Sequence, residues 1–136
     1  MTRAIQQRVL FRATPQELFE LYMDSRKHSR ATGAPAKISR KIGGPWRAHG
    51  GQIGGTNLLI IPGKMVVQAW RAGFWKKEEV SILVLKFSKS RGGGQVDLVH
   101  AGVPAHDFKG VREGWRKYYW KPWQKYLSER KRKRRG

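Results

Sequence analysis

The alternation of apolar and polar residues near the N-terminus predicts one strand followed by two short helices. The segment Arg8–Arg12 has the residue types and the two-residue period of a strand. Thr14–Glu17 then reads Thr-Pro-Gln-Glu, the spacing of a capping box with proline at the first helical position. A second short helix is expected over Ser25–Ala31, ending near Gly33.

The middle of the chain has the pattern of an antiparallel sheet. Short apolar segments are separated by Gly- and Pro-rich turns, and six further strands are expected: Lys37–Ile42, Trp46–His49, Gln52–Ile61, Lys64–Gly73, Glu79–Ser88 and Gly94–Ala101. Within the last of these, His100 shares a face with Val96 and Leu98, because side chains alternate along a strand.

The C-terminal segment Gly110–Lys133 predicts one long amphipathic helix. Its apolar positions recur at helical spacing: Val111, Trp115, Tyr118 or Tyr119, Trp123, and Tyr126 or Leu127. Pro122 lacks an N–H group, so a kink is expected there. The order of elements predicts the α+β class, with a curved antiparallel sheet of about six to seven strands wrapped around this helix.

Length and composition indicate a single globular domain, expected over residues 1–129, with a basic tail over 130–136. The 136 residues include no cysteine, which excludes disulfides, thiolate metal sites and a cysteine nucleophile. The N-terminus lacks the apolar core of a signal peptide, and no apolar run is long enough to cross a bilayer. A cytoplasmic protein without a transmembrane segment is therefore expected.

The charge is strongly positive, with 29 Lys and Arg against 9 Asp and Glu and a net charge of +20. Between Ser25 and Lys77 there are eleven basic residues and no acidic one. A compact basic run near the C-terminus consists of Arg130, Lys131, Arg132, Lys133, Arg134 and Arg135. The positive electrostatic potential of such a surface attracts nucleic acid, an anionic membrane or an acidic protein. The alternative is a solvated surface without a partner.

Catalytic chemistry has little support in the sequence. The four histidines are not spaced as a metal pair on one helix face, so no metal or cofactor is expected. His49, beside Gly50, is expected to be exposed, and His106–Asp107 is an isolated dipeptide. His100 is either a hydrogen-bonded core residue or a polar group inside a ligand cavity. No catalytic residue is assigned, and an enzyme is not the favoured interpretation.

Carboxylates and glycines do not change that conclusion. Glu78 and Glu79 are the only adjacent acids, and neighbouring strand residues face opposite sides, so they are expected at the surface. The glycine-rich stretch Gly50–Gly55 lies between strands, whereas a phosphate-binding loop opens a helix. Within Trp115–Lys121 the aromatic and basic residues fall on different sides of a helix, which favours a buried stripe over a base-stacking surface.

Several motifs occur together in a recognisable order: Gly33, Gly43–Pro45, Gly51–Gly55, Val67–Arg71, Trp75, His100–Pro104 and Gly114–Trp120. With them the chain resembles the activator of heat-shock-protein-90 ATPase homologue family, within the START-like, pollen-allergen-like SRPBCC superfamily. The likeness extends from about Arg8 to Leu127. It implies a helix-grip fold with a cavity between the sheet and the C-terminal helix. The family's eukaryotic chaperone activators, which act in the stress response, carry this module beside a larger domain.

Three functions follow from the residues and the resemblance. The first is a non-enzymatic binding module for a small hydrophobic ligand or a chaperone-like partner, its cavity formed by Trp70, Leu98, His100, Trp115 and Tyr119. Here His100 and Tyr119 are the expected polar contacts. The second is polyanion binding, including nonspecific nucleic acid, with the run Arg130–Arg135 as the main determinant and the basic stretch Arg26–Lys77 as support. The third, drawn only from the superfamily, is a cyclase- or hydrolase-like enzyme.

Overall fold

The computed structural model describes residues 1–135, with side chains through Lys133. Its strands are β1 (Thr2–Phe11), β2 (Lys37–Ile38), β3 (Pro45–Ala48), β4 (Ile53–Ile61), β5 (Met65–Ala72), β6 (Ser81–Ser90) and β7 (Gly93–Pro104). Its α-helices are α1 (Pro15–Met23), α2 (Ser25–Thr32), α3 (Phe108–Trp115) and α4 (Lys121–Arg135). Two short 3-10 turns, η1 (His49–Gly51) and η2 (Ala105–Asp107), and one π-helical turn, η3 (Arg116–Trp120), complete the order.

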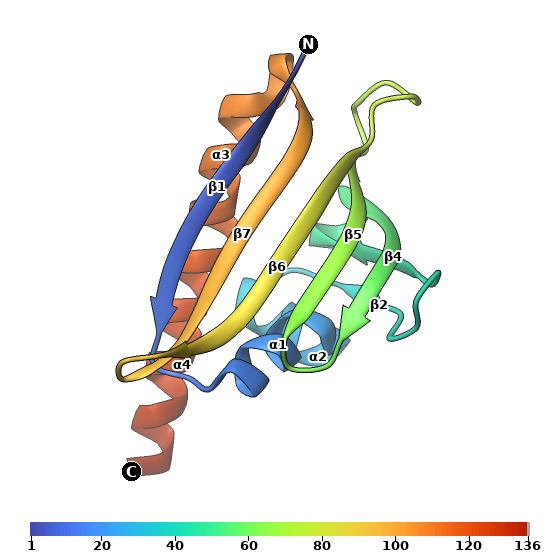
Figure 1. Cartoon of the computed structure of the whole chain (residues 1–136). Coiled ribbons are helices and arrows are strands. Elements are labelled where there is room, and N and C mark those ends of the chain that lie inside the picture. The colour runs from blue at the N-terminus through green and yellow to red at the C-terminus, as the bar shows by residue number, and fades with distance from the viewer. Residues whose placement is uncertain (136) are drawn as a thin grey trace.

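The seven strands form one antiparallel sheet in the order β1-β7-β6-β5-β4-β3-β2. Figure 1 shows the long helix, formed by α3, η3 and α4, running behind β1 and β7, with α1 and α2 at the lower end of the sheet. The α+β helix-grip architecture and the strand number predicted from the sequence are confirmed. Among the described helices, none combines the length and apolarity that a bilayer-spanning helix requires.

Local capping explains where the first two helices begin and end. The Thr14 hydroxyl accepts a hydrogen bond from the Glu17 N–H at 3.1 Å, and the Glu17 carboxylate accepts from the Thr14 N–H at 3.0 Å. The predicted capping box is therefore confirmed. Asp24 caps α2 in the same way, accepting from the Lys27 N–H at 2.9 Å. Gly33, with φ of 77°, ends α2 in the left-handed conformation that favours glycine.

The strand boundaries differ from the predicted ones mainly at the two edges of the sheet. β1 begins at Thr2 rather than at Arg8, because pairing with β7 extends it through a polar stretch in which Ile5 is the buried position. β2 ends at Ile38 instead of Ile42, since only Lys37 and Ile38 pair with β3. Edge pairing thus depends on the partner strand more than on the alternation within the segment.

The long helix contains a wider turn where the sequence predicts a kink. The π-helical turn η3 ends directly before Lys121, one residue ahead of Pro122. In a regular α-helix the Pro122 ring would clash with the Tyr118 carbonyl, and a wider turn separates such groups. Of the two adjacent tyrosines in this turn, Tyr119 is buried and Tyr118 is 50% exposed.

The core lies between the sheet and the inner stripe of this helix. Trp123 is completely buried, and its ring packs against those of Phe11, Tyr22 and Trp120. Trp115 is 2% exposed and stacks on Trp120 at a centroid distance of 5.5 Å. Aromatic side chains bury much apolar area each, so this stripe supplies a large part of the driving force for holding the helix on the sheet.

Candidate functional site

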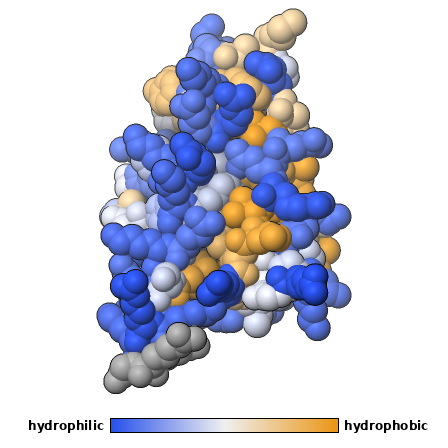
Figure 2. Space-filling view, turned by 90° about the vertical axis from the view of Figure 1, so that its left-hand side faces the viewer, coloured by the Kyte–Doolittle hydropathy of each residue, from blue (hydrophilic) through white to orange (hydrophobic). Residues whose placement is uncertain are grey.

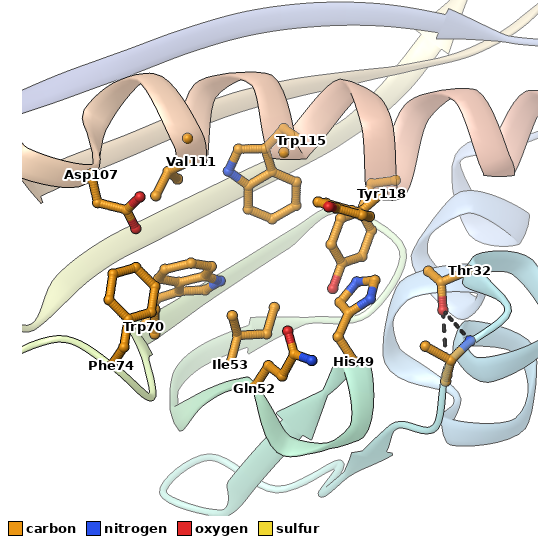
Figure 3. A pocket seen from close by; sticks show the side chains of 15 residues that line it. Thr32, His49, Gln52, Ile53, Trp70, Phe74, Asp107, Val111, Trp115 and Tyr118 are labelled. Carbon is orange, nitrogen blue, oxygen red and sulfur yellow. Dashed lines mark hydrogen bonds between the residues drawn. The ribbon is translucent and has the colours of Figure 1, made fainter.

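A hollow of about 510 Å³ lies between the long helix and the strands β4 and β5. Figure 3 shows the helix above the hollow, with Val111, Trp115 and Tyr118 on the helix side. Trp70 and Ala72 of β5 and Ile53 of β4 line the opposite side. Val111 and Trp115 are four positions apart and project toward the sheet, whereas Tyr118 lies at the exposed edge of the hollow.

Small residues on the helix create this space. Gly110 and Gly114 line the hollow one turn apart. A Cβ atom added at Gly114 would meet the Tyr118 ring at 3.6 Å and nothing closer, which is ordinary van der Waals contact. The side-chain space at Gly114 is therefore open. The opening of the hollow, which we call the mouth, carries the side chains of Phe74 and Tyr118, 73% and 50% exposed.

A loop with unusual backbone geometry brings a histidine to the hollow. His49, Gly50 and Gly51 have consecutive positive φ angles of 51°, 68° and 89°. The Gly50 N–H donates to the Pro35 carbonyl at 2.9 Å, which anchors the loop. His49 packs edge-to-face on Tyr119 at a centroid distance of 5.1 Å. It is half-buried, so the expectation of an exposed His49 is wrong, because the helix that covers it comes from a distant part of the chain.

Two polar atoms of residues that line the hollow are buried without a hydrogen-bond partner among the described residues. They are Nε1 of Trp70 and Nε2 of His49. Burial also lowers the pKa of His49 below its usual range, so this side chain is neutral near neutral pH. A buried polar atom without a partner is uncommon in proteins. These two atoms are the polar features of a lining that is otherwise mainly apolar.

His100 lies in the core against the wall formed by Trp70 and Trp115, with ring centroids at 4.7 and 5.9 Å. The Trp115 indole N–H donates to Nδ1 of His100 at 3.1 Å, so Nε2 carries the proton and donates to the Ser81 hydroxyl at 2.7 Å. That hydroxyl donates in turn to the Trp70 carbonyl at 2.8 Å. Burial lowers the pKa of His100 to about 3. Both ring nitrogens are thus used within the protein.

The predicted cavity residues therefore separate into two groups. Trp70, Trp115 and Tyr119 line the hollow. Leu98 and His100 are buried in the core, 1% and 0% exposed. His100 was expected to offer a polar contact to a ligand, and its geometry matches the other interpretation, a hydrogen-bonded core histidine. Strand alternation places it on the inner face but does not distinguish a core position from a cavity position.

A second buried histidine fixes Tyr119. Nδ1 of His28 donates to the Tyr22 carbonyl at 2.8 Å, so its Nε2 accepts from the Tyr119 hydroxyl at 3.0 Å. Burial lowers the pKa of His28 to about 4 and raises the pKa of Tyr119. No local sequence pattern indicates this role of His28, because its partner is 91 positions away along the chain. Tyr119 therefore offers its ring, rather than a free hydroxyl, to the hollow.

The remaining ionisable candidates lie at the surface or are paired. Nε2 of His106 is 3.0 Å from the Glu79 carboxylate, and Asp107 accepts from the Trp75 indole N–H at 2.8 Å. Within residues 1–135 there is no group of three His, Cys, Asp or Glu side chains able to hold a metal ion. The basic run is an extension of α4, which continues to Arg135. Arg134 and Arg135 lie outside the residues whose side chains are described.

Comparison with known proteins places this geometry in a family. Residues 12–128 match the family described as Activator of Hsp90 ATPase homolog 1-like protein. A relative from Dictyostelium discoideum, "Activator of 90 kDa heat shock protein ATPase homolog", is 26% identical over 117 residues, which are 85% of this chain and 30% of that protein. The human "Activator of 90 kDa heat shock protein ATPase homolog 1" is 27% identical over 109 residues, 80% of this chain and 32% of that protein.

The chain thus spans about a third of the length of the curated relatives it matches. A solved structure described as an HSP90 activator from Plasmodium falciparum superposes with a TM-score of 0.82 at 20% identity, covering 94% of this chain and 96% of that one. That likeness shows the shared fold. Since the family match covers residues 12–128, the chain belongs to the family of Activator of Hsp90 ATPase homolog 1-like proteins.

Proposed function

We propose that this chain is a non-enzymatic binding module whose hollow receives a small apolar ligand. The observation that carries the proposal is the hollow of about 510 Å³ under the long helix. Its aromatic walls come from Trp70, Trp115 and Tyr119, and Gly110 and Gly114 line it on the helix side. A volume of several hundred Å³ with mainly apolar walls is typical of small-molecule sites.

The polar groups around the hollow support binding rather than catalysis. Proton transfer needs an acid or base within hydrogen-bond reach of a substrate. His100 and His28 use both ring nitrogens in internal hydrogen bonds, and Asp107 accepts from Trp75. These groups therefore act as parts of the framework that shapes the hollow. His49 is the lining histidine that leaves a ring nitrogen unpaired among the described residues, and no described carboxylate is bonded to it to complete an acid–base pair.

Fluorescence of N-phenyl-1-naphthylamine, a neutral apolar dye, tests the proposal. The wild-type chain is expected to bind it with enhanced emission. Gly114→Leu fills the open space at position 114 and is expected to weaken binding about tenfold or more, while leucine improves helix propensity over glycine. Lys117→Leu adds the same side chain at an exposed position of the same helix and serves as the control. Equal binding by the wild type and Gly114→Leu would contradict the proposal.

The family adds a protein partner to this function. The relatives are named as activators of a 90 kDa heat-shock-protein ATPase, and we propose that this module docks on such a chaperone. Its positive charge favours an acidic docking surface. Calorimetric titration of the chain into purified 90 kDa heat-shock protein is expected to show binding that weakens with salt, together with a change in ATPase rate. Absence of binding at low salt would contradict this part.

Polyanion binding is a second candidate, and a groove at the other side of the helix favours it. This groove, of about 470 Å³, lies between the end of β1 and α4 and includes Arg12, Lys131 and Arg132. Figure 2 shows this side of the molecule, with hydrophilic residues over most of it and apolar residues between them. Exposed cations around a groove suit a phosphate backbone, which makes affinity strongly salt-dependent.

A labelled twenty-nucleotide oligothymidylate tests this candidate. Each phosphate neutralised is expected to contribute about 0.7 log units of affinity per log unit of salt for a single strand. Replacing Arg12, Lys131 and Arg132 by Gln is expected to lower the affinity for the oligonucleotide and to make that affinity less dependent on salt. The control variant removes three basic residues elsewhere, Lys37, Arg47 and Lys64. Equal losses in the two variants would show a general charge effect and no specific groove.

A further inference from the structure

The six indole N–H groups of this chain differ in whether the protein supplies a hydrogen-bond acceptor. Four donate to protein acceptors: Trp46 to the Ala69 carbonyl, Trp75 to Asp107, Trp115 to His100 and Trp120 to Gln7. Within the described residues, Trp70 and Trp123 have no such partner. Trp123 is 0% exposed in the closed core, whereas Trp70 lines the hollow. Trp70 is therefore the unpaired indole that a ligand in the hollow could satisfy.

The packing around Trp70 explains why the protein supplies no acceptor. Its ring lies against Trp75 at 5.3 Å and against His100 at 4.7 Å. His100 has no lone pair left, because its Nδ1 accepts from Trp115 and its Nε2 donates to Ser81. Trp70 is 5% exposed, so bulk water does not replace the missing partner. A buried donor left in this state is costly unless another group accepts from it.

His49 supplies a second unpaired polar atom on the far side of the hollow. In Figure 3, Trp70 and His49 lie on opposite sides of Ile53. The positive φ of 51° at His49 is uncommon for a residue other than glycine, and such backbone is frequent at functional sites. The rings of Tyr118 and Tyr119 hold the imidazole in place at centroid distances of 5.7 and 5.1 Å.

The charge of the lining restricts the ligand further. Among the described residues around the hollow there is no Lys or Arg, and Asp107 is the one acidic side chain. A carboxylate or phosphate would therefore lie without a counter-charge in a mainly apolar space, which is unfavourable. A neutral carbonyl oxygen accepts a hydrogen bond without that cost. Flat rings suit walls made of Trp70, Trp115 and Tyr119.

We propose that the hollow selects neutral, flat aromatic ketones or related carbonyl compounds, with the carbonyl oxygen accepting from Nε1 of Trp70 and a second polar group meeting Nε2 of His49. This inference rests on the proposed function, since it names the ligand class for the same hollow. Nε1 of Trp70 and Nε2 of His49 are buried in this structure, so a ligand reaches them only when neighbouring side chains move aside. Phe74 and Tyr118, at the mouth, are 73% and 50% exposed.

A matched pair of dyes tests the carbonyl contact. The probes are 6-propionyl-2-dimethylaminonaphthalene, a neutral ketone, and 6-propyl-2-dimethylaminonaphthalene, which lacks the carbonyl oxygen. The wild type is expected to bind the ketone about five- to tenfold more tightly, the range of one buried hydrogen bond. Trp70→Phe keeps an aromatic ring but removes the donor, so the ratio of the two affinities is expected to fall to about one. The ratio cancels any general loss of apolar contact.

Two further variants make the result specific. Trp75→Phe removes an indole N–H that already donates to Asp107, and it is expected to keep the preference for the ketone. His49→Leu changes a half-buried side chain outside the core and is expected to reduce ketone affinity about threefold. Thermal unfolding with circular dichroism checks that each variant is folded. Should Trp70→Phe not fold, the His49→Leu result and the wild-type ratio decide the question.

The outcomes separate the inference from the function on which it rests. A wild type that binds both dyes equally, or a folded Trp70→Phe that keeps the full preference, overturns the carbonyl contact and leaves apolar ligand binding standing. A wild type that binds neither dye overturns the inference and the proposed ligand-binding function together. Loss of the preference in Trp70→Phe alone, with Trp75→Phe unchanged, supports the assignment.

Discussion

Two histidines, His100 behind a wall of the hollow and His49 in its lining, have opposite environments. His100 is fully buried, and both of its ring nitrogens are hydrogen-bonded, one to Trp115 and one to Ser81. His49 is half-buried at the hollow, and its Nε2 has no partner among the described residues. The first joins the helix to the strands, and the second leaves its hydrogen-bonding capacity to a ligand.

This difference in hydrogen bonding indicates which polar side chains stabilise the fold and which are available to a ligand. A polar group that the protein has fully hydrogen-bonded stabilises the structure, because removing it leaves its partners unsatisfied. A polar group without a partner at the edge of a hollow contributes little to the fold. His28, bonded to Tyr22 and Tyr119, belongs with His100, and Trp70 belongs with His49. Substitutions and pH changes at these residues test this division.

Acidification acts on the core histidines. Their pKa values in the folded protein are about 4 for His28 and about 3 for His100, below the ordinary 6.5. Below pH 6.5 the unfolded chain therefore binds more protons than the folded one, and stability that is fully present above pH 6.5 is lost as the pH falls toward 4. At about 1.4 kcal/mol per pH unit, each histidine costs on the order of 3 kcal/mol by pH 4.

Urea unfolding at pH values between 7 and 4 measures this loss. His28→Gln and His100→Gln remove one titrating group each and are expected to flatten the pH dependence separately. His106→Gln is the control, because His106 is exposed at the surface. If the free energy of unfolding depends on pH equally in the wild type and in both core variants, other groups control the loss of stability in acid.

Truncation of a core histidine has the next largest effect. His100→Ala leaves the Trp115 N–H unpaired and creates a cavity, so the free energy of unfolding is expected to fall by about 2–4 kcal/mol. His49→Ala, by contrast, is expected to cost less than about 1 kcal/mol. Chemical denaturation of both variants at pH 7.5 gives the comparison. Equal losses at the two positions would remove the distinction between the two environments.

Gly114→Ala acts on the hollow and on the helix at once. Alanine is favoured over glycine inside a helix by about 1 kcal/mol, and the added Cβ meets the Tyr118 ring at an ordinary 3.6 Å. The variant is expected to be more stable by about 0.5–1 kcal/mol and to bind N-phenyl-1-naphthylamine somewhat more weakly. Thermal unfolding and dye titration measure the two effects. A destabilised variant would mean that Gly114 is required by packing.

The smallest expected effect is on stability in His49→Gly. Glycine adopts the positive φ of position 49 without strain, so stability is expected to stay within about 0.5 kcal/mol of the wild type. Affinity for the naphthyl ketone is expected to fall because a wall contact and a polar atom are lost. A large loss of stability would place His49 with His100 as a structural residue.

Much of the fold could be predicted because its signals are local. The capping box at Thr14–Glu17, the αL glycine at Gly33 and the alternation in Ser81–Ser90 depend on neighbours within a few positions. The inner stripe of the long helix followed from helical spacing, although spacing left Tyr118 and Tyr119 as alternatives. Tertiary contacts distinguish them: Tyr119 packs against Trp123 and donates to His28, whereas Tyr118 is half exposed.

The candidate site was less accessible to sequence reasoning. The family resemblance pointed to Trp70, Trp115 and Tyr119, which line the hollow. It did not separate them from His100, which is in the core, and it missed His49. A positive φ at His49 has one weak signal, the two glycines that follow it. That these glycines shape a loop against the distant helix is a property of the assembled fold.

The sequence alone determined the α+β class, the helix starts, the turns and the family, because each depends on residue types at short or fixed spacings. Which polar atoms have hydrogen-bond partners depends on the folded structure, since those partners lie far apart along the chain. Tyr119 reaches His28 across 91 positions, and Asp107 reaches Trp75 across 32. Hydrogen bonds form where atoms meet in space, so one residue type has different roles at positions 28, 49, 100 and 106.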